Sequence, residues 1–92
     1  MPSLSSHRKY FDLAPHVPQA LANRLNRHPQ LAPLPSLEAR AAELRRWTGR
    51  SLSTCKAVLS GKPAAKDLWL GFAGLVGGLA AVYAECARIR GQ

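Results

Sequence analysis

The sequence contains few of the residues that carry out catalysis or hold metal ions. Its 92 residues include five Asp or Glu, three His and two Cys. The carboxylates form no evident acid–base pair, and His7, His16 and His28 lack the spacing of metal ligands. Cys55 and Cys86 lie in different segments, without the CxxC spacing of a metal or redox site. We therefore expect no enzymatic activity, no metal site and no cofactor.

The N-terminal segment lacks the apolar core that follows the first basic residues of a secretory signal. Two cysteines without a motif are also typical of reduced thiols in the cytosol, although one disulfide between them is the alternative. We therefore expect a cytoplasmic protein.

Acidic residues are scarce beside 13 Lys and Arg, which leaves a net charge of +8. Such an excess favours an anionic partner: nucleic acid, a lipid surface or an acidic protein. The basic residues are spread along the chain rather than joined in a polybasic tail. A chain of this length forms one small domain with a modest core, so a large catalytic cavity is not expected.

Proline is concentrated in residues 1–35, which hold six of the seven prolines. We predict a disordered or loosely packed basic arm in this region, with one short helix that begins at Pro18. Residues 31–35 should form an extended connector. Three apolar residues of the arm are candidates for holding it against the remaining chain: Tyr10, Phe11 and Leu13.

Two short helices with clear end signals follow, over residues 37–47 and 52–60. Ser36 and Ser51 are suited to cap the two N-termini, and Gly49 and Gly61 to end the helices in the left-handed conformation. Apolar residues at helical spacing should face inward: Leu37, Ala41, Leu44, Trp47, Cys55, Val58 and Leu59. Two short helices joined by a brief turn with a glycine are typical of a helix-turn-helix.

The segment around this turn resembles the turn and recognition helix of phage and bacterial repressors, which often carry Thr-Gly-x-Ser-x-Ser-Thr-x-x-x-Val-Leu-(Ser or Asn)-Gly-Lys. The resemblance covers residues 41–62. Arg45 and Arg50 stand where such proteins have a small and an apolar residue. The matching residues are Thr48, Gly49, Ser51, Ser53, Thr54, Val58, Leu59, Ser60, Gly61 and Lys62.

The resemblance implies that helix 52–60 lies in the major groove of double-stranded DNA. Side chains at its start would contact base edges, and flanking cations would bind phosphates and set the register. The implied DNA-binding residues are Arg46, Arg50, Ser51, Ser53, Thr54, Lys56, Ala57 and Lys62.

The C-terminal region contains a long apolar stretch, which we predict to be one helix over residues 64–90. Residues 68–84 carry no charge and are close to the minimum length of a membrane span. Gly71, Gly74 and Gly78 form a narrow stripe of small residues at helical spacing, which favours close packing of a neighbouring helix or a homodimer contact. The same stretch is compatible with burial in a bilayer.

The sequence thus predicts a small all-α, four-helix domain. Residues 1–35 form the Pro-rich arm with one short helix, and residues 36–92 form a helical domain with the helix-turn-helix at 37–60. The leading hypothesis is a dimeric, sequence-specific regulator of the kind that phages and mobile elements encode. The first alternative is a tail-anchored inner-membrane protein, spanning at 68–84, whose basic head stays in the cytoplasm and binds lipid or a partner. The second is a small inhibitor of a host protein.

Overall fold

The computed structural model describes residues 14–64 and 66–91, and all regular structure in this part of the chain is helical. This agrees with the predicted all-α class. The described part contains five α-helices rather than four. Residues 1–13 of the predicted N-terminal arm, with Tyr10, Phe11 and Leu13, lie outside the described residues, whereas residues 14–35 are described. The elements are η1 (Ala14–His16), α2 (Val17–Asn26), α3 (Leu37–Thr48), α4 (Leu52–Leu59), α5 (Lys66–Ala73), η2 (Gly74–Val76) and α6 (Leu79–Arg90).

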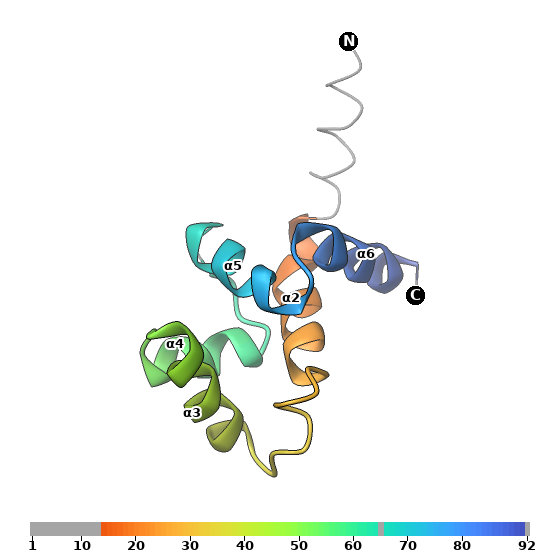
Figure 1. The fold of residues 1–92 in the computed structure, drawn as a ribbon. Coiled ribbons are helices and arrows are strands. Elements are labelled where there is room, and N and C mark those ends of the chain that lie inside the picture. The colour runs from red at the N-terminus through yellow and green to blue at the C-terminus, as the bar shows by residue number, and fades with distance from the viewer. Residues whose placement is uncertain (1–13, 65, 92) are drawn as a thin grey trace.

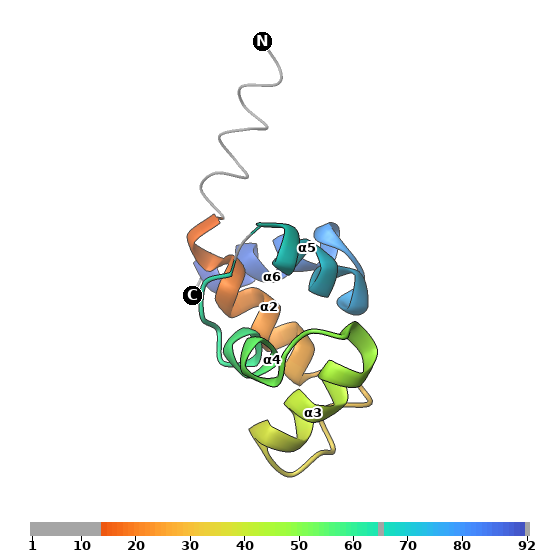
Figure 2. The same ribbon diagram turned by 90° about the vertical axis from the view of Figure 1, so that its left-hand side faces the viewer.

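Helix α2 lies at the centre of the molecule, between the α3–α4 pair on one side and α5 and α6 on the other (Figures 1 and 2). Its apolar positions recur at helical spacing, and Leu21 and Leu25 are buried. Phe72 and Val82 approach from α5 and α6 and are also buried. The core therefore forms around α2, which the sequence had placed in the N-terminal arm.

The connector between α2 and α3 is a series of turns, so the predicted extended conformation of residues 31–35 is wrong. The N–H groups of Leu31 and Ala32 bond the His28 carbonyl at 2.9 and 2.8 Å, and Leu34 N–H bonds the Leu31 carbonyl at 3.0 Å. These local bonds coil the chain and turn Leu31 inward, where it is fully buried. The connector thus supplies a core residue as well as a link.

The predicted single helix over residues 64–90 is also wrong, because the chain turns sharply at Gly77 and Gly78. Their φ angles are +104° and +86°, conformations that favour glycine. The Gly78 N–H bonds the Ala73 carbonyl at 2.8 Å, which is the closing bond of a Schellman helix end. Helix α6 then starts in a new direction, at 92° to the segment Asp67–Val76.

This turn divides the predicted membrane span at 68–84. Within the described residues, no single helix is both long and apolar enough to cross a bilayer. The segments Asp67–Val76 and Leu79–Arg90 meet that requirement only when taken together, across the 92° bend.

The three glycines of the predicted stripe do not share one helix. Gly71 lies in α5, Gly74 in η2, and Gly78 in the turn. Gly71 and Gly74 are exposed, and a methyl group built on either would have no neighbour within 4 Å. No other helix among the described residues therefore packs closely on them. Their predicted role in a homodimer contact stays a prediction.

Candidate DNA-binding surface

The turn between α3 and α4 has the end signals expected from the sequence. The Ser36 hydroxyl accepts the Ala39 N–H at 3.1 Å, and the Ser51 hydroxyl accepts the Thr54 N–H at 3.2 Å. Gly49 ends α3 in the left-handed conformation, with φ of +72°. Side-chain caps and a left-handed glycine satisfy backbone groups that a helix end leaves unpaired. The local sequence thus fixes where both helices begin and where α3 ends.

The two helices pack through small and apolar side chains. Ala41 and Leu44 of α3, and Cys55 and Val58 of α4, are all buried. The Thr48 hydroxyl lies 4.0 Å from the Cys55 sulfur and links the helices. Burial raises the pKa of the Cys55 thiol. Cys55 is therefore a core residue and not a reactive nucleophile.

Arg45 and Arg50 are both exposed, so neither occupies the interior position that the resemblance assigns to it. Together with the exposed Arg46 they form a group that we call the turn arginines. Arg46 pairs with Glu43 at 3.4 Å, whereas Arg45 and Arg50 have no ion-pair partner among the described residues. The sequence prediction included Arg46 and Arg50 but missed Arg45, whose place at the end of α3 beside Arg46 was the available signal.

The polar residues at the start of α4 differ in how far their side chains are engaged. The Ser51 hydroxyl caps the helix and donates to the Thr54 hydroxyl at 2.9 Å. Ser53 is exposed on the same turn. Ala57, one turn later, is half-buried. Of these predicted contact residues, Ser53 presents the hydroxyl that is most available to a ligand.

The predicted base-contacting Lys56 is engaged with another side chain. Its ammonium donates to the Glu38 carboxylate of α3 at 2.9 Å, and this bond lowers the pKa of Glu38. Both side chains are accessible to solvent, so the pair is readily exchanged for another contact. No sequence spacing predicted this pair, because 18 positions separate the two residues.

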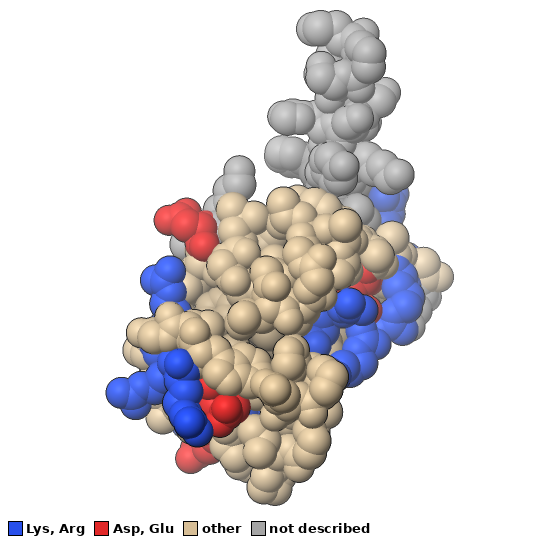
Figure 3. All heavy atoms as spheres, in the orientation of Figure 1, with Lys and Arg blue, Asp and Glu red and all other residues tan. Residues whose placement is uncertain are grey.

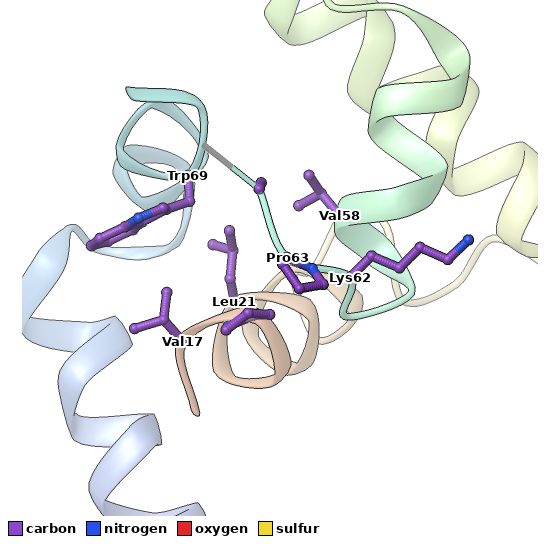
Figure 4. A pocket seen from close by; sticks show the side chains of 8 residues that line it. Val17, Leu21, Val58, Lys62, Pro63 and Trp69 are labelled. Atoms are coloured by element: carbon purple, nitrogen blue, oxygen red, sulfur yellow. The ribbon is translucent and has the colours of Figure 1, made fainter. Parts of the chain in front are cut away.

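Lys62 lies beyond the C-terminal end of α4, away from the other predicted residues. It borders a hollow of about 210 Å³, which Val17, Leu21, Val58 and Trp69 line with apolar groups. Figure 4 shows the Lys62 ammonium directed away from this hollow. The ammonium is therefore available to an anion that approaches α4 from outside.

We expect Ser51→Ala to lower the free energy of unfolding by about 1 kcal/mol, because it removes an N-cap. Ser53→Ala, two residues away on the exposed side, should change stability by less than about 0.5 kcal/mol. Urea unfolding of both variants gives the comparison. Equal losses would show that the Ser51 hydroxyl does not have the capping role that its geometry indicates.

Basic residues gather in two places on the face shown in Figure 3. One group lies over α3 and α4, where acidic side chains are interspersed. The second lies beside α2 and α6, where Arg27 and Arg88 both donate to the buried carboxylate of Glu85. Asn23 adds a bond to Glu85 at 3.3 Å. The second group thus contains an internal counter-charge, whereas the cations around the α3–α4 turn are largely directed to solvent.

No protein-family model, curated protein or solved structure matches the chain.

Proposed function

We propose that this protein is a sequence-specific regulator that binds double-stranded DNA through α4. The observation that carries the proposal is the capped α3–α4 turn, with cations on both sides of α4 that have no ion-pair partner among the described residues. Arg45 and Arg50 lie toward its N-terminal end, and Lys62 lies beyond its C-terminal end. The resemblance of residues 41–62 to repressor helix-turn-helix segments supports the same function.

The start of α4 suits contact with an anionic, hydrogen-bonding groove. Aligned peptide dipoles place partial positive charge at a helix N-terminus. Ser53 and Thr54 add hydroxyl groups that bond bases or phosphates, and the Ala57 methyl group suits contact with a thymine methyl. Arg45 and Arg50 then hold the backbone and set the register of α4 in the major groove.

Lys56 enters this proposal through an exchange of partners. In the free protein it pairs with the exposed Glu38. When α4 approaches DNA, the Lys56 ammonium turns to a phosphate or a guanine, and Glu38 loses its counter-charge. Glu38 therefore opposes DNA binding, and removal of its charge should strengthen the binding of DNA.

We also propose that the regulator acts as a homodimer on a two-fold site, because one small helix contacts only a few base pairs. The exposed apolar residues Leu70 and Leu79 lie on the uncharged part of the chain around Gly74 and are the candidate contact. Sedimentation of the free and DNA-bound protein measures the stoichiometry directly.

Selection from a pool of random duplexes should enrich one sequence, against which variants are then compared. Arg50→Gln should weaken binding to every duplex several-fold and reduce the slope of log affinity against log salt by about 0.9, since one phosphate contact is lost. Ser53→Ala should lower the affinity for the selected duplex about fivefold, as expected for roughly 1 kcal/mol, and leave the affinity for other duplexes unchanged. Glu38→Gln should strengthen binding to all duplexes.

Arg90→Gln is the charge-matched control, because Arg90 ends α6 on the side of the molecule away from α3 and α4 (Figure 1). It should leave the affinity nearly unchanged at 0.15 M salt, where distant charges are screened. The proposal is wrong when no sequence is enriched, or when Arg90→Gln and Arg50→Gln reduce affinity and salt slope equally.

A further inference from the structure

One hollow lies between the end of α3 and α5, and a neighbouring one lies between the end of α2 and η2. The first has a volume of about 220 Å³ and is bordered by Trp47, Arg50, Gly71 and Phe72. The second has a volume of about 330 Å³ and is bordered by Arg24, Arg27, His28 and Val76. Leu75 lines both hollows, and the rings of His28 and Trp47 lie 5.0 Å apart across their boundary. We call the two hollows together the α3–α5 groove.

The first hollow has an apolar floor, and it is deep because one of its lining residues is a glycine. Phe72 is buried at its base, and Trp47 and Leu75 form half-buried walls. Gly71 lines the hollow without a side chain, and a methyl group built there meets no atom within 4 Å. Each hollow has room for several water molecules, at about 30 Å³ each. Release of these waters by an apolar side chain is favourable.

Arginines border both hollows. Arg50 borders the first hollow, and Arg24 and Arg27 border the second. The Arg24 guanidinium already donates a 3.2 Å hydrogen bond to the Val76 carbonyl. The side chain therefore loses little conformational freedom when it binds an anion. Arg27 shares Glu85 with Arg88, and no carboxylate borders either hollow in the described structure.

We propose that the α3–α5 groove binds an acidic amphipathic helix of another protein. Apolar anchors at i, i+3 or i+4, and i+7 would enter the two hollows, and carboxylates beside them would pair with Arg24 and Arg50. Trp and Arg are the residues that most often dominate such interfaces. The groove is small, so we expect a dissociation constant on the order of 10–100 μM for one short helix.

Charge and polarity favour this occupant over the other possible ones. Nucleic acid would place phosphates over a floor of aromatic and aliphatic groups, which do not compensate for lost hydration. The chain's own undescribed N-terminal residues carry Arg8 and Lys9, and a second copy has a net charge of +8. An acidic helix from a different protein complements both the charge and the apolar floor.

The test uses a labelled twelve-residue peptide with Leu and Phe at the anchor positions and Glu at most others. Its binding to the full-length protein is followed by fluorescence anisotropy. Gly71→Leu, which fills the first hollow, should weaken binding at least tenfold. Gly74→Ala is the matched control, because Gly74 is exposed without bordering either hollow, and it should bind as the wild type does.

A second variant, Arg24→Gln/Arg50→Gln, keeps the proposal testable should Gly71→Leu fail to fold. It should lower the affinity for the peptide at least tenfold and remove most of the salt dependence of peptide binding. A peptide with Gln in place of Glu should bind at least tenfold less tightly than the Glu peptide. Equal binding of the two peptides, or unchanged binding to Gly71→Leu, would overturn the proposal. Binding of the fatty-acid anion decanoate without binding of the peptide would also overturn it, because the ligand would then be a lipid and not a helix.

The peptide test does not depend on DNA binding, since Gly71 and Arg24 are outside the proposed DNA surface. Loss of peptide binding in Gly71→Leu with unchanged DNA affinity supports the groove alone. Arg50 belongs to both surfaces, so an active peptide should also compete with DNA.

Discussion

The double variant Gly77→Ala/Gly78→Ala should be less stable than the wild type by about 2–5 kcal/mol, because both residues hold conformations that alanine adopts only under strain. Gly77 has φ of +104°, and Gly78 combines φ of +86° with ψ of −172°. A methyl group on Gly77 would also lie 3.1 Å from the Ala81 methyl group, closer than ordinary contact. For a chain of this size the loss is a large fraction of the total stability.

Circular dichroism should distinguish this loss of stability from that of an ordinary packing defect. Alanine favours continuation of a helix, whereas glycine disfavours it by about 1 kcal/mol. The strained variant can relieve its turn by joining α5, η2 and α6 into one rod. That rod would draw the buried Val82 and Cys86 away from α2 and Phe72. We therefore expect helical circular dichroism at 222 nm to be maintained or to increase while the urea midpoint falls.

Gly71→Ala is the control for this variant. Gly71 lies inside α5 with open space around it, so alanine should raise stability by about 0.5–1 kcal/mol. The measurement is urea unfolding of both proteins at the same pH. A double variant as stable as the wild type would contradict the left-handed turn at residues 77 and 78.

The contrast between Ser36, Ser51 and this turn shows what local sequence can predict. Caps at Ser36 and Ser51 depend on bonds within three residues, so their sequence signals are nearly sufficient. The break at Gly77 and Gly78 lies inside an uncharged stretch whose composition suits a continuous helix equally well. The two adjacent glycines were a signal for the break. Whether the chain breaks there, however, depends on whether α6 can pack against α2, which the local sequence does not state.

The candidate surfaces depended on contacts between residues distant in sequence. Arg24 reaches the Val76 carbonyl across 52 positions, and Lys56 reaches Glu38 across 18. Periodicity assigns residues to faces of one helix but does not state which helix covers that face. The α3–α5 groove was not predicted for the same reason, since its walls come from α2, the α3–α4 turn and α5. Leu31 was missed because its connector appeared extended and Pro-rich.

Glu85 is the buried acidic residue of the described core, and it joins α6 to α2. It is 4% exposed, and its carboxylate accepts bonds from Arg88, Arg27 and Asn23. The hydrogen bond from Arg88 is the main cause that lowers the pKa of Glu85 to about 2, with Arg27 and Asn23 adding to the effect against the cost of burial. The charged form of Glu85 is therefore the form that stabilises the fold.

We expect Glu85→Gln to lose about 2 kcal/mol of stability at pH 7, because the neutral amide loses the charge-assisted bonds and leaves two guanidinium groups without their counter-charge. The loss is smaller than for a fully enclosed ion pair, since Arg27 and Arg88 remain half-exposed at 52% and 53%. Glu43→Gln is the control: the Glu43 side chain is 31% exposed and pairs at 3.4 Å with Arg46, which is 77% exposed. The Gln oxygen can still accept the 3.0 Å bond from the Trp47 indole N–H, so the loss of charge should cost less than about 0.5 kcal/mol.

The pH dependence gives the sharper measurement, because its direction follows from the sign of the pKa shift. The unfolded chain binds a proton at Glu85 near pH 4.5, and the folded chain does so only near pH 2. The contribution of Glu85 is therefore complete above about pH 5, and it falls as the pH drops from 4.5 to 2. The difference in unfolding free energy between wild type and Glu85→Gln should shrink steadily over this interval. A constant difference from pH 7 to pH 2 would mean that the ionised carboxylate does not hold α6 against α2.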